Sequence, residues 1–177
     1  NSGGTITFDR TPPELSIGQR PAGGECYSPG LVPDPDINVE DDFDAAPSLT
    51  QSVSENGCGQ TLEVEAIDAC GNSSKVTRDY FIAKRFEEGG DVTINGPANG
   101  DLVSEAAFTW QVAGPAECVT GENAQISVDG AVGAYASGQI RNVAGDYSFT
   151  LDLKNCGGIS KTFIRTFSVN APPVVVA

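Results

Sequence analysis

Residues 57–75, GCGQTLEVEAIDACGNSSK, decide the fold predicted for this chain. The centre of the stretch alternates apolar and polar residues with a period of two, which predicts a half-buried β-strand between two cysteines. Residues 145–161, GDYSFTLDLKNCGGISK, show the same alternation, followed by Cys-Gly, a serine and a lysine. The chain therefore carries one strand-and-turn element twice.

The remaining sequence alternates in the same way. About a dozen short segments with period-two patterning are separated by Gly, Pro, Asn and Asp, which is typical of β-sandwiches. The longest helix candidate, residues 101–114, places Phe108, Trp110 and Val112 two residues apart and is therefore also a strand. We expect an all-β protein, with Trp110 in a core.

The repeated element predicts two tandem immunoglobulin-like β-sandwich domains. Placing Cys70 on Cys156 shifts the sequence by 86 residues, a suitable length for one such domain, and also aligns Gly59 with Gly145. The strand positions fall in phase only if one residue is skipped just before the cysteine, so we expect a bulge or a one-residue gap there. The predicted organisation is a first domain at 10–86, a hinge at 87–91 and a second domain at 92–171.

Both ends of the chain carry a Pro-Pro pair. TFDRTPPELSI near the start resembles FSVNAPPVVVA at the end, and in each a strand runs into Pro-Pro and then into a new apolar segment. Pro-Pro cannot donate ladder hydrogen bonds and stiffens a junction. We expect residues 1–9 to be the terminal strand of a preceding unit or a donor strand, and residues 172–177 to begin a following unit.

The composition argues against several functions. A net charge of −14 disfavours nucleic acids and anionic membrane surfaces as partners, and no apolar run is long enough to span a membrane. The chain contains no His, so the usual general base is missing, and it has no phosphate-binding G-x-x-x-x-G-K-[ST] motif. We do not expect an enzyme.

Five cysteines without His or C-x-x-C indicate disulfides and a secreted or cell-surface location. In the expected sandwich topology, Cys118 and Cys156 both lie at the chain-entry end of the second domain, so we pair them. Cys26 and Cys58 both lie at the far end of the first domain and form the second predicted pair. Cys70 is then the unpaired thiol, although a Cys26–Cys70 bridge that leaves Cys58 free is the alternative.

Several aspartates are expected to converge at the entry end of the first domain. They come from the entry junction, the connection between the second and third strands, and the end of the repeated strand. Carboxylates gathered without a basic neighbour repel one another, and Ca²⁺, which binds six to eight oxygens, would relieve this repulsion. The alternative is a solvated acidic loop in which Asp serves turns and caps. The candidate ligands are Asp9, Asp41, Asp42, Asp44 and Asp68.

Three stretches of the first domain resemble the hyalin-repeat and bacterial immunoglobulin-like modules of secreted surface proteins. FDRTPPELSI matches a D-x-T-P-P junction, VEDDFDAAPSLT an Asp-rich stretch before proline, and LEVEAIDACGNSSKV an A-x-D-x-x-G-N element. The second domain retains only the Cys-Gly-x-x-Ser-Lys element and the general strand pattern. The resemblance implies extracellular repeat arrays that serve adhesion, matrix or spacing, without enzymatic activity.

Three non-catalytic functions are consistent with these observations. The first is a structural or adhesive repeat segment of a secreted protein that contacts neighbouring repeats or other copies, with its terminal segments as candidate donor strands. The second is an accessory glycan- or protein-binding module of a secreted enzyme, for which Tyr27, Tyr135 and Tyr147 are the candidate exposed aromatics. The third, a phage or virion decoration domain, is disfavoured by the disulfides.

Overall fold

The chain folds as an all-β protein, as its alternating patterns predict. The computed structural model describes residues 8–170, and no α-helix occurs among them. The chain divides into two compact units, residues 1–82 and 83–177. That each unit is immunoglobulin-like stays a prediction, and so do the strands expected at residues 1–9 and 172–177. Those segments lie outside the described residues except for residues 8 and 9, which belong to no strand.

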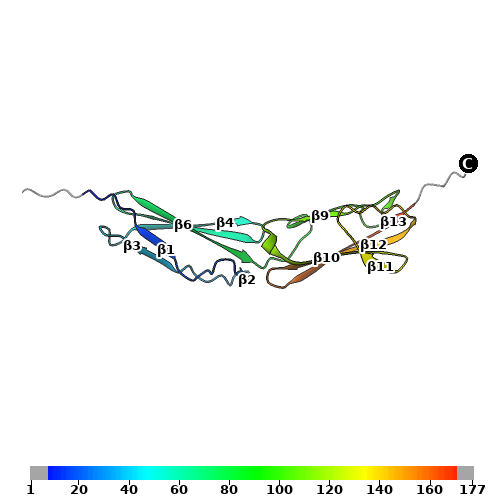
Figure 1. The fold of residues 1–177 in the computed structure, drawn as a ribbon, viewed down its shortest axis with the longest axis horizontal. Coiled ribbons are helices and arrows are strands. Elements are labelled where there is room, and N and C mark those ends of the chain that lie inside the picture. The colour runs from blue at the N-terminus through cyan, green and yellow to red at the C-terminus, as the bar shows by residue number, and fades with distance from the viewer. Residues whose placement is uncertain (1–7, 171–177) are drawn as a thin grey trace, which may run out of the picture. The chain divides into compact units, whose positions relative to one another are not determined.

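The first unit contains two sheets (Figure 1). Its strands are β1 (Glu14–Ile17), β2 (Cys26–Tyr27), β3 (Ile37–Glu40), β4 (Ser48–Asn56), β5 (Gly59–Ile67) and β6 (Ser73–Ile82). Strands β1 and β3 form an antiparallel pair, and the larger sheet has the order β2-β6-β5-β4, with β2 parallel to β6. The alternation along β5 points Leu62 and Val64 into a core that they share with Ile17, Tyr80 and Ile82.

The second unit also contains two sheets. Its strands are β7 (Val92–Asn95), β8 (Leu102–Val103), β9 (Thr109–Val112), β10 (Val119–Val128), β11 (Ala131–Ala134), β12 (Gly145–Asn155) and β13 (Ser160–Val169), with a short 3-10 helix, η1 (Ala116–Cys118), before β10. Strands β7 and β9 pair, and the larger sheet has the order β11-β10-β12-β13-β8. Its core is aromatic: Phe108 stacks on Phe149 at 4.1 Å between ring centroids, and Trp110 packs against this core while partly buried.

The division between the units differs from the predicted boundary at residue 86. It falls between Ile82 and Ala83, because Phe86 is buried in the core of the second unit. Residues 87–91, predicted as a hinge, form a turn of the second unit in which the N–H of Val92 donates to the carbonyl of Glu87. The Gly-Gly pair there forms part of this turn, and a hinge at residues 87–91 stays a prediction.

The two units share one strand connectivity. The pair β1-β3 corresponds to β7-β9, and the order β2-β6-β5-β4 corresponds to β8-β13-β12-β10, including the parallel pairing of the short strand with the last strand. The second unit adds β11 beyond β10, whereas the first unit joins β4 to β5 by a tight turn. The predicted repeat is therefore present at the level of topology.

The predicted alignment of the repeat is wrong by one residue. Buried Leu62, Val64 and Ala66 of β5 correspond to buried Phe149, Leu151 and Leu153 of β12, and each partner lies 87 positions later, as from 62 to 149. The same shift relates β6 to β13, from Ser73 to Ser160. No bulge in β12 is needed before the cysteine, because its register with β13 is unbroken from Gly145 to Lys154. The register shift in this sheet lies in β10, between Val119 and Gly121. Cys70 therefore corresponds to Gly157, and Cys156 corresponds to Ala69.

Candidate metal centre

The turn after β5 is organised by the side chain of Asp68. Its Oδ1 accepts hydrogen bonds from the N–H groups of Cys70 and Asn72, both at 2.8 Å, and its Oδ2 accepts one from Nδ2 of Asn72 at 2.7 Å. The backbone N–H of Asp68 also donates to the carbonyl of Asn72. An aspartate that bonds its own backbone in this way fixes a tight turn. The residue is only 5 % exposed.

Asn155 organises the equivalent turn of the second unit. Its Oδ1 accepts from the N–H groups of Gly157 and Ile159, the counterparts of Cys70 and Asn72. Its Nδ2 donates to the carbonyl of Lys84 at 2.6 Å, a bond that a carboxylate could not make. These hydrogen bonds identify Asn155 as the counterpart of Asp68.

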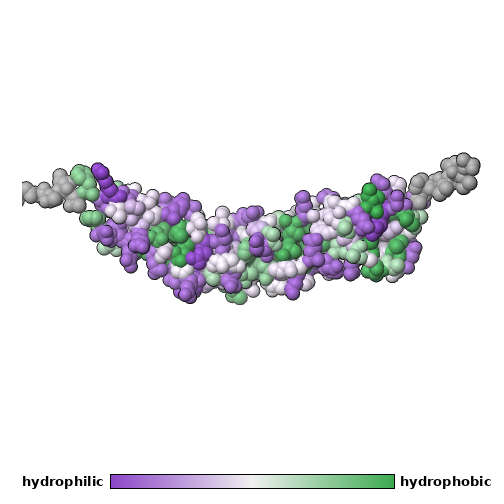
Figure 2. All heavy atoms as spheres, viewed as in Figure 1, coloured by the Kyte–Doolittle hydropathy of each residue, from purple (hydrophilic) through white to green (hydrophobic). Residues whose placement is uncertain are grey.

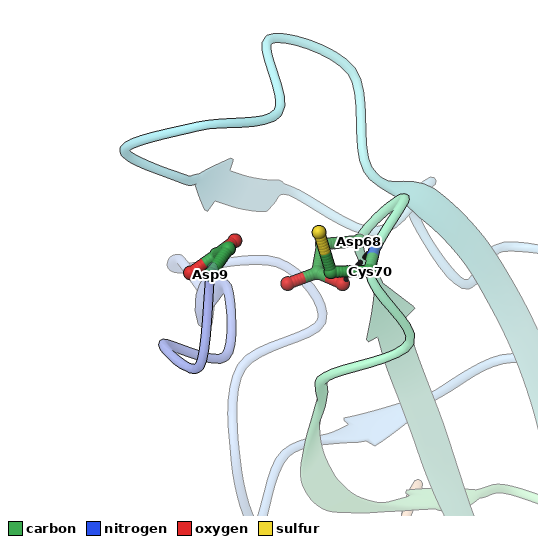
Figure 3. Close-up of side chains that lie close together, drawn as sticks. All are labelled: Asp9, Asp68 and Cys70. Atoms are coloured by element: carbon green, nitrogen blue, oxygen red, sulfur yellow. Dashed lines mark hydrogen bonds between the residues drawn. The ribbon is translucent and has the colours of Figure 1, made fainter. Parts of the chain in front are cut away.

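Asp9 and Cys70 lie beside Asp68 at one end of the first unit. One potential ligand atom from each of the three residues lies within 4.8 Å of the other two. Figure 3 shows Asp9 reaching from the segment before β1 toward Asp68 and Cys70 in the turn after β5. Oδ1 of Asp9 accepts a hydrogen bond from the N–H of Thr11, whereas its Oδ2 is shielded from solvent and has no hydrogen-bond partner.

The loop that follows β3 carries the other three predicted ligands, and it only borders this group. Asp44 contacts the turn directly, because its Oδ2 accepts a hydrogen bond from the N–H of Ala69 at 2.9 Å. Oδ1 of Asp41 accepts from the N–H groups of Phe43 and Asp44, and its Oδ2 is a second shielded carboxylate oxygen without a partner. Asp42 is exposed, and like Asp41 and Asp44 it lies outside the group formed by Asp9, Asp68 and Cys70.

The local electrostatics keep Asp68 ionised. Burial is the largest influence and raises the pKa of its carboxyl group. The hydrogen bonds from the side chain of Asn72 and from the N–H groups of Asn72, Cys70 and Gly71 together outweigh it, and the pKa lies below its usual value. The carboxylate is therefore negative in neutral solution and available to a cation.

The spacing of the group suits one ion. Ca²⁺ binds oxygens at about 2.3–2.6 Å, so two of its ligands can lie up to roughly 5 Å apart. Asp9 and Asp68 meet this condition. The shielded Oδ2 of Asp9 is a potential metal ligand, and it accepts no hydrogen bond from the described residues. Cys70 offers a thiol, which prefers softer ions such as Zn²⁺. Sequence reasoning missed Cys70 as a possible ligand, although its position two residues after Asp68 was the available signal.

Four of the five cysteines are disulfide-bonded. They are Cys26, Cys58, Cys118 and Cys156, whereas Cys70 is free and exposed. Cys58 is therefore not the free cysteine that the alternative pairing required. The registers agree with the predicted pairs, which stay predictions. In the first unit, Cys26 lies opposite Phe81, and so does Gly59, the residue after Cys58; in the second, Val119 after Cys118 lies opposite Asn155 before Cys156.

No protein-family model matches this chain, and no curated protein matches its sequence. A functional proposal therefore depends on the residues and the fold.

Proposed function

We propose that the chain is a non-catalytic structural or adhesive repeat segment of a secreted or cell-surface protein. The observation that carries this proposal is the shared strand connectivity of the two units, together with the repeated side-chain-bonded turn at Asp68 and Asn155. Structural repeats commonly join end to end into extended arrays. The resemblance of the first unit to hyalin-repeat and bacterial immunoglobulin-like modules points the same way.

The disulfides support an extracellular location. Two disulfides are formed, which is typical of proteins in oxidising compartments. None of the helical structure in residues 8–170 is long and apolar enough to cross a membrane. We therefore propose a secreted or cell-surface segment whose partners are neighbouring repeats or other copies of the same protein.

The alternative function, an accessory glycan-binding module, needs an exposed row of aromatic side chains. Two of the three candidate tyrosines are core residues: Tyr135 is 6 % exposed and Tyr147 is 5 % exposed. Tyr27 packs edge-on against Tyr80 beside the core of the first unit. The prediction that these tyrosines lie outside the cores is therefore wrong, and no specific observation favours the alternative.

We propose calcium as the ion of the first unit, held by Asp9 and Asp68 with Asp41 and Asp44 beside them. Ca²⁺ would satisfy the shielded Oδ2 of Asp9 and join the segment before β1 to the turn after β5. The second unit has a neutral Asn155 at the equivalent position, so no ion is proposed there.

The proposal is tested by thermal unfolding of the full chain with its disulfides intact. Ca²⁺ at about 100 times its dissociation constant stabilises a folded site by about 2.7 kcal/mol, which raises the unfolding midpoint of a unit of this size by roughly 10–20 °C. We expect this rise in the first unit only, and we expect Asp9→Asn and Asp68→Asn to remove it. Asp42→Asn is the matched control, because Asp42 is exposed and outside the group.

The same experiment distinguishes between the possible ions. A shift with Zn²⁺ that disappears in Cys70→Ser would replace calcium by a thiolate-bound ion. Unchanged midpoints with both ions would reject the metal centre but not the repeat-segment proposal. That proposal is contradicted if the chain binds a defined glycan saturably, for example on a glycan array.

A further inference from the structure

We propose that β4 of the first unit pairs edge to edge with β4 of a second copy of the chain, antiparallel and centred on Gln51. The inference rests on the proposed function, which it deepens by naming the strand through which copies assemble. It differs from strand donation by the terminal segments, because it uses only described residues of the folded unit. It also holds whether or not the first unit binds an ion.

Within residues 8–170, strand β4 is an open edge without a covering strand and without Pro or Lys. It is the last strand of its sheet and pairs with β5 in an unbroken register from Ser48 opposite Ile67 to Asn56 opposite Gly59. All nine of its residues are exposed, and none is Pro or Lys, the residues that commonly block edge pairing. Leu49 and Val53, on the core-facing side of the strand, are 40 % and 50 % exposed.

In the second unit, the strand that corresponds to β4 is covered by a further strand. There β10 corresponds to β4, and β11 pairs with it antiparallel from Gln125 opposite Ala134 to Val128 opposite Ala131. The first unit lacks this strand because a two-residue turn at Gly57 and Cys58 leads directly from β4 into β5. By analogy with β10, the open edge of β4 is suited to pairing with an antiparallel strand.

The turn also determines which backbone groups of β4 are available. Gly57 has a φ of 60°, as required at the first position of a type II′ hairpin turn, so Asn56 and Gly59 form a hydrogen-bonded pair. Hydrogen-bonded positions alternate along an antiparallel ladder. The N–H and C=O groups of Leu49, Gln51 and Val53 therefore point away from β5, toward the open edge.

The sequence of β4 is self-complementary in one antiparallel register. With Gln51 on a two-fold axis, Leu49 lies opposite Val53 of the second copy and Thr50 lies opposite its Ser52. Apolar residues then face apolar residues, and Glu55 lies opposite Pro47 rather than another acid. A closed two-fold dimer is also the commonest symmetric assembly.

A groove beside the strand offers space for the incoming side chain. It has a volume of about 310 Å³, and its lining includes Val53, Leu62, Tyr80 and Val32. In the proposed register Leu49 of the second copy lies opposite Val53 and therefore at this groove. On the face drawn in Figure 2, apolar patches interrupt the otherwise mostly hydrophilic surface of the first unit.

A cysteine on the proposed axis tests the register. Gln51→Cys in a Cys70→Ser background places two thiols on a hydrogen-bonded pair with Cα atoms about 5.5 Å apart, within the range that a disulfide spans. We expect rapid formation of a covalent dimer under mild oxidation. Val53→Cys in the same background is the matched control, since its two copies would lie roughly 13 Å apart along the strands.

Association in solution tests the surface. We expect sedimentation of the full chain to show a monomer–dimer equilibrium that salt strengthens, because each copy carries a net charge of −14. Gln51→Pro should abolish the dimer, since it removes central bonds at the open edge without removing a bond to β5. Val53→Lys should weaken it by roughly tenfold. Val132→Lys, on exposed edge strand β11, is the control and should leave it unchanged.

The results separate this inference from the function on which it rests. A chain that stays monomeric at about millimolar concentration, or one that dimerises equally well as Gln51→Pro, overturns the β4 interface. Equal cross-linking of the Gln51→Cys and Val53→Cys proteins overturns the register. Neither result changes the ion and glycan measurements, which test the proposed function separately.

Discussion

The buried side chain of Asn155 supports the second unit through three hydrogen bonds, and replacing it by Ala is the sharpest structural test. The side chain is 1 % exposed and connects the turn after β12 with the segment that enters the unit. Asn155→Ala would remove the donor to the carbonyl of Lys84 and the acceptor for the N–H groups of Gly157 and Ile159. The hydroxyl of Thr120 also donates to the backbone carbonyl of Asn155 at 2.7 Å, and the substitution leaves this bond in place.

The expected cost follows from these bonds. Each contributes about 1 kcal/mol, so the loss is about 3 kcal/mol. Since 1 kcal/mol shifts the midpoint of a unit of this size by about 4–8 °C, we expect a fall of roughly 12–24 °C. Asn155→Asp should also destabilise at neutral pH, because it keeps the two accepted bonds but sets a carboxylate oxygen against the carbonyl of Lys84.

Scanning calorimetry of the full chain measures this prediction. The transition of the second unit should fall in both variants, and that of the first unit should stay in place because Asn155 belongs to the second unit. Asp68→Asn is the reciprocal control and should leave the second transition unchanged. A fall of less than about 3 °C for Asn155→Ala, or an equal fall of both transitions, would refute the role assigned to this side chain.

Three further predictions concern other parts of the chain. The lowered pKa of Asp68 means that its contribution to stability is complete above the unfolded value of about 3.9 and is lost as the pH falls through the lower native pKa. Acid unfolding of the first unit should therefore show this loss, and Asp68→Asn should flatten it; an unchanged profile would contradict the assignment. Phe149→Ala, at a fully buried residue stacked on Phe108, should destabilise the second unit by about 3–5 kcal/mol in urea unfolding, and a loss below 1 kcal/mol would disprove its central place in the core. Peptide mapping of the unreduced protein should recover Cys26 with Cys58 and Cys118 with Cys156, and any peptide that joins the two units would contradict both pairs.

The alternation of apolar residues was sufficient to predict the two repeated strands and their buried sides. Leu62 and Val64 in β5, and Phe149 and Leu151 in β12, are all buried as period-two patterning requires. The alignment failed at the cysteines, because Cys-Gly occurs in both stretches while the turn is defined by the residue that bonds its backbone. The shared burial pattern of the strands and the hydrogen bonds of Asp68 and Asn155 together show that these two residues are equivalent.

Other errors arose from tertiary packing. Phe86 follows the last strand of the first unit in sequence but packs in the second core, so the boundary could not be placed from the Gly-Gly pair. Aspartate content predicted where carboxylates would gather, yet it could not separate Asp9 and Asp68 from exposed Asp42. The sequence could not group Cys70 with Asp9 and Asp68, because the comparison of the two repeats placed it on Cys156. Its counterpart in the structure is Gly157, where an added Cβ would lie 2.4 Å from Cβ of Ala83.

Single-molecule force spectroscopy of the full chain tests most directly whether it is a structural segment of two similarly built units. We predict two separate unfolding events per molecule, each extending the chain by less than its full unit length because a disulfide keeps part of that unit closed. Reduction should lengthen both extensions, and calcium should raise the force of one event only. A single event, or a gradual extension without distinct unfolding forces, would contradict the account.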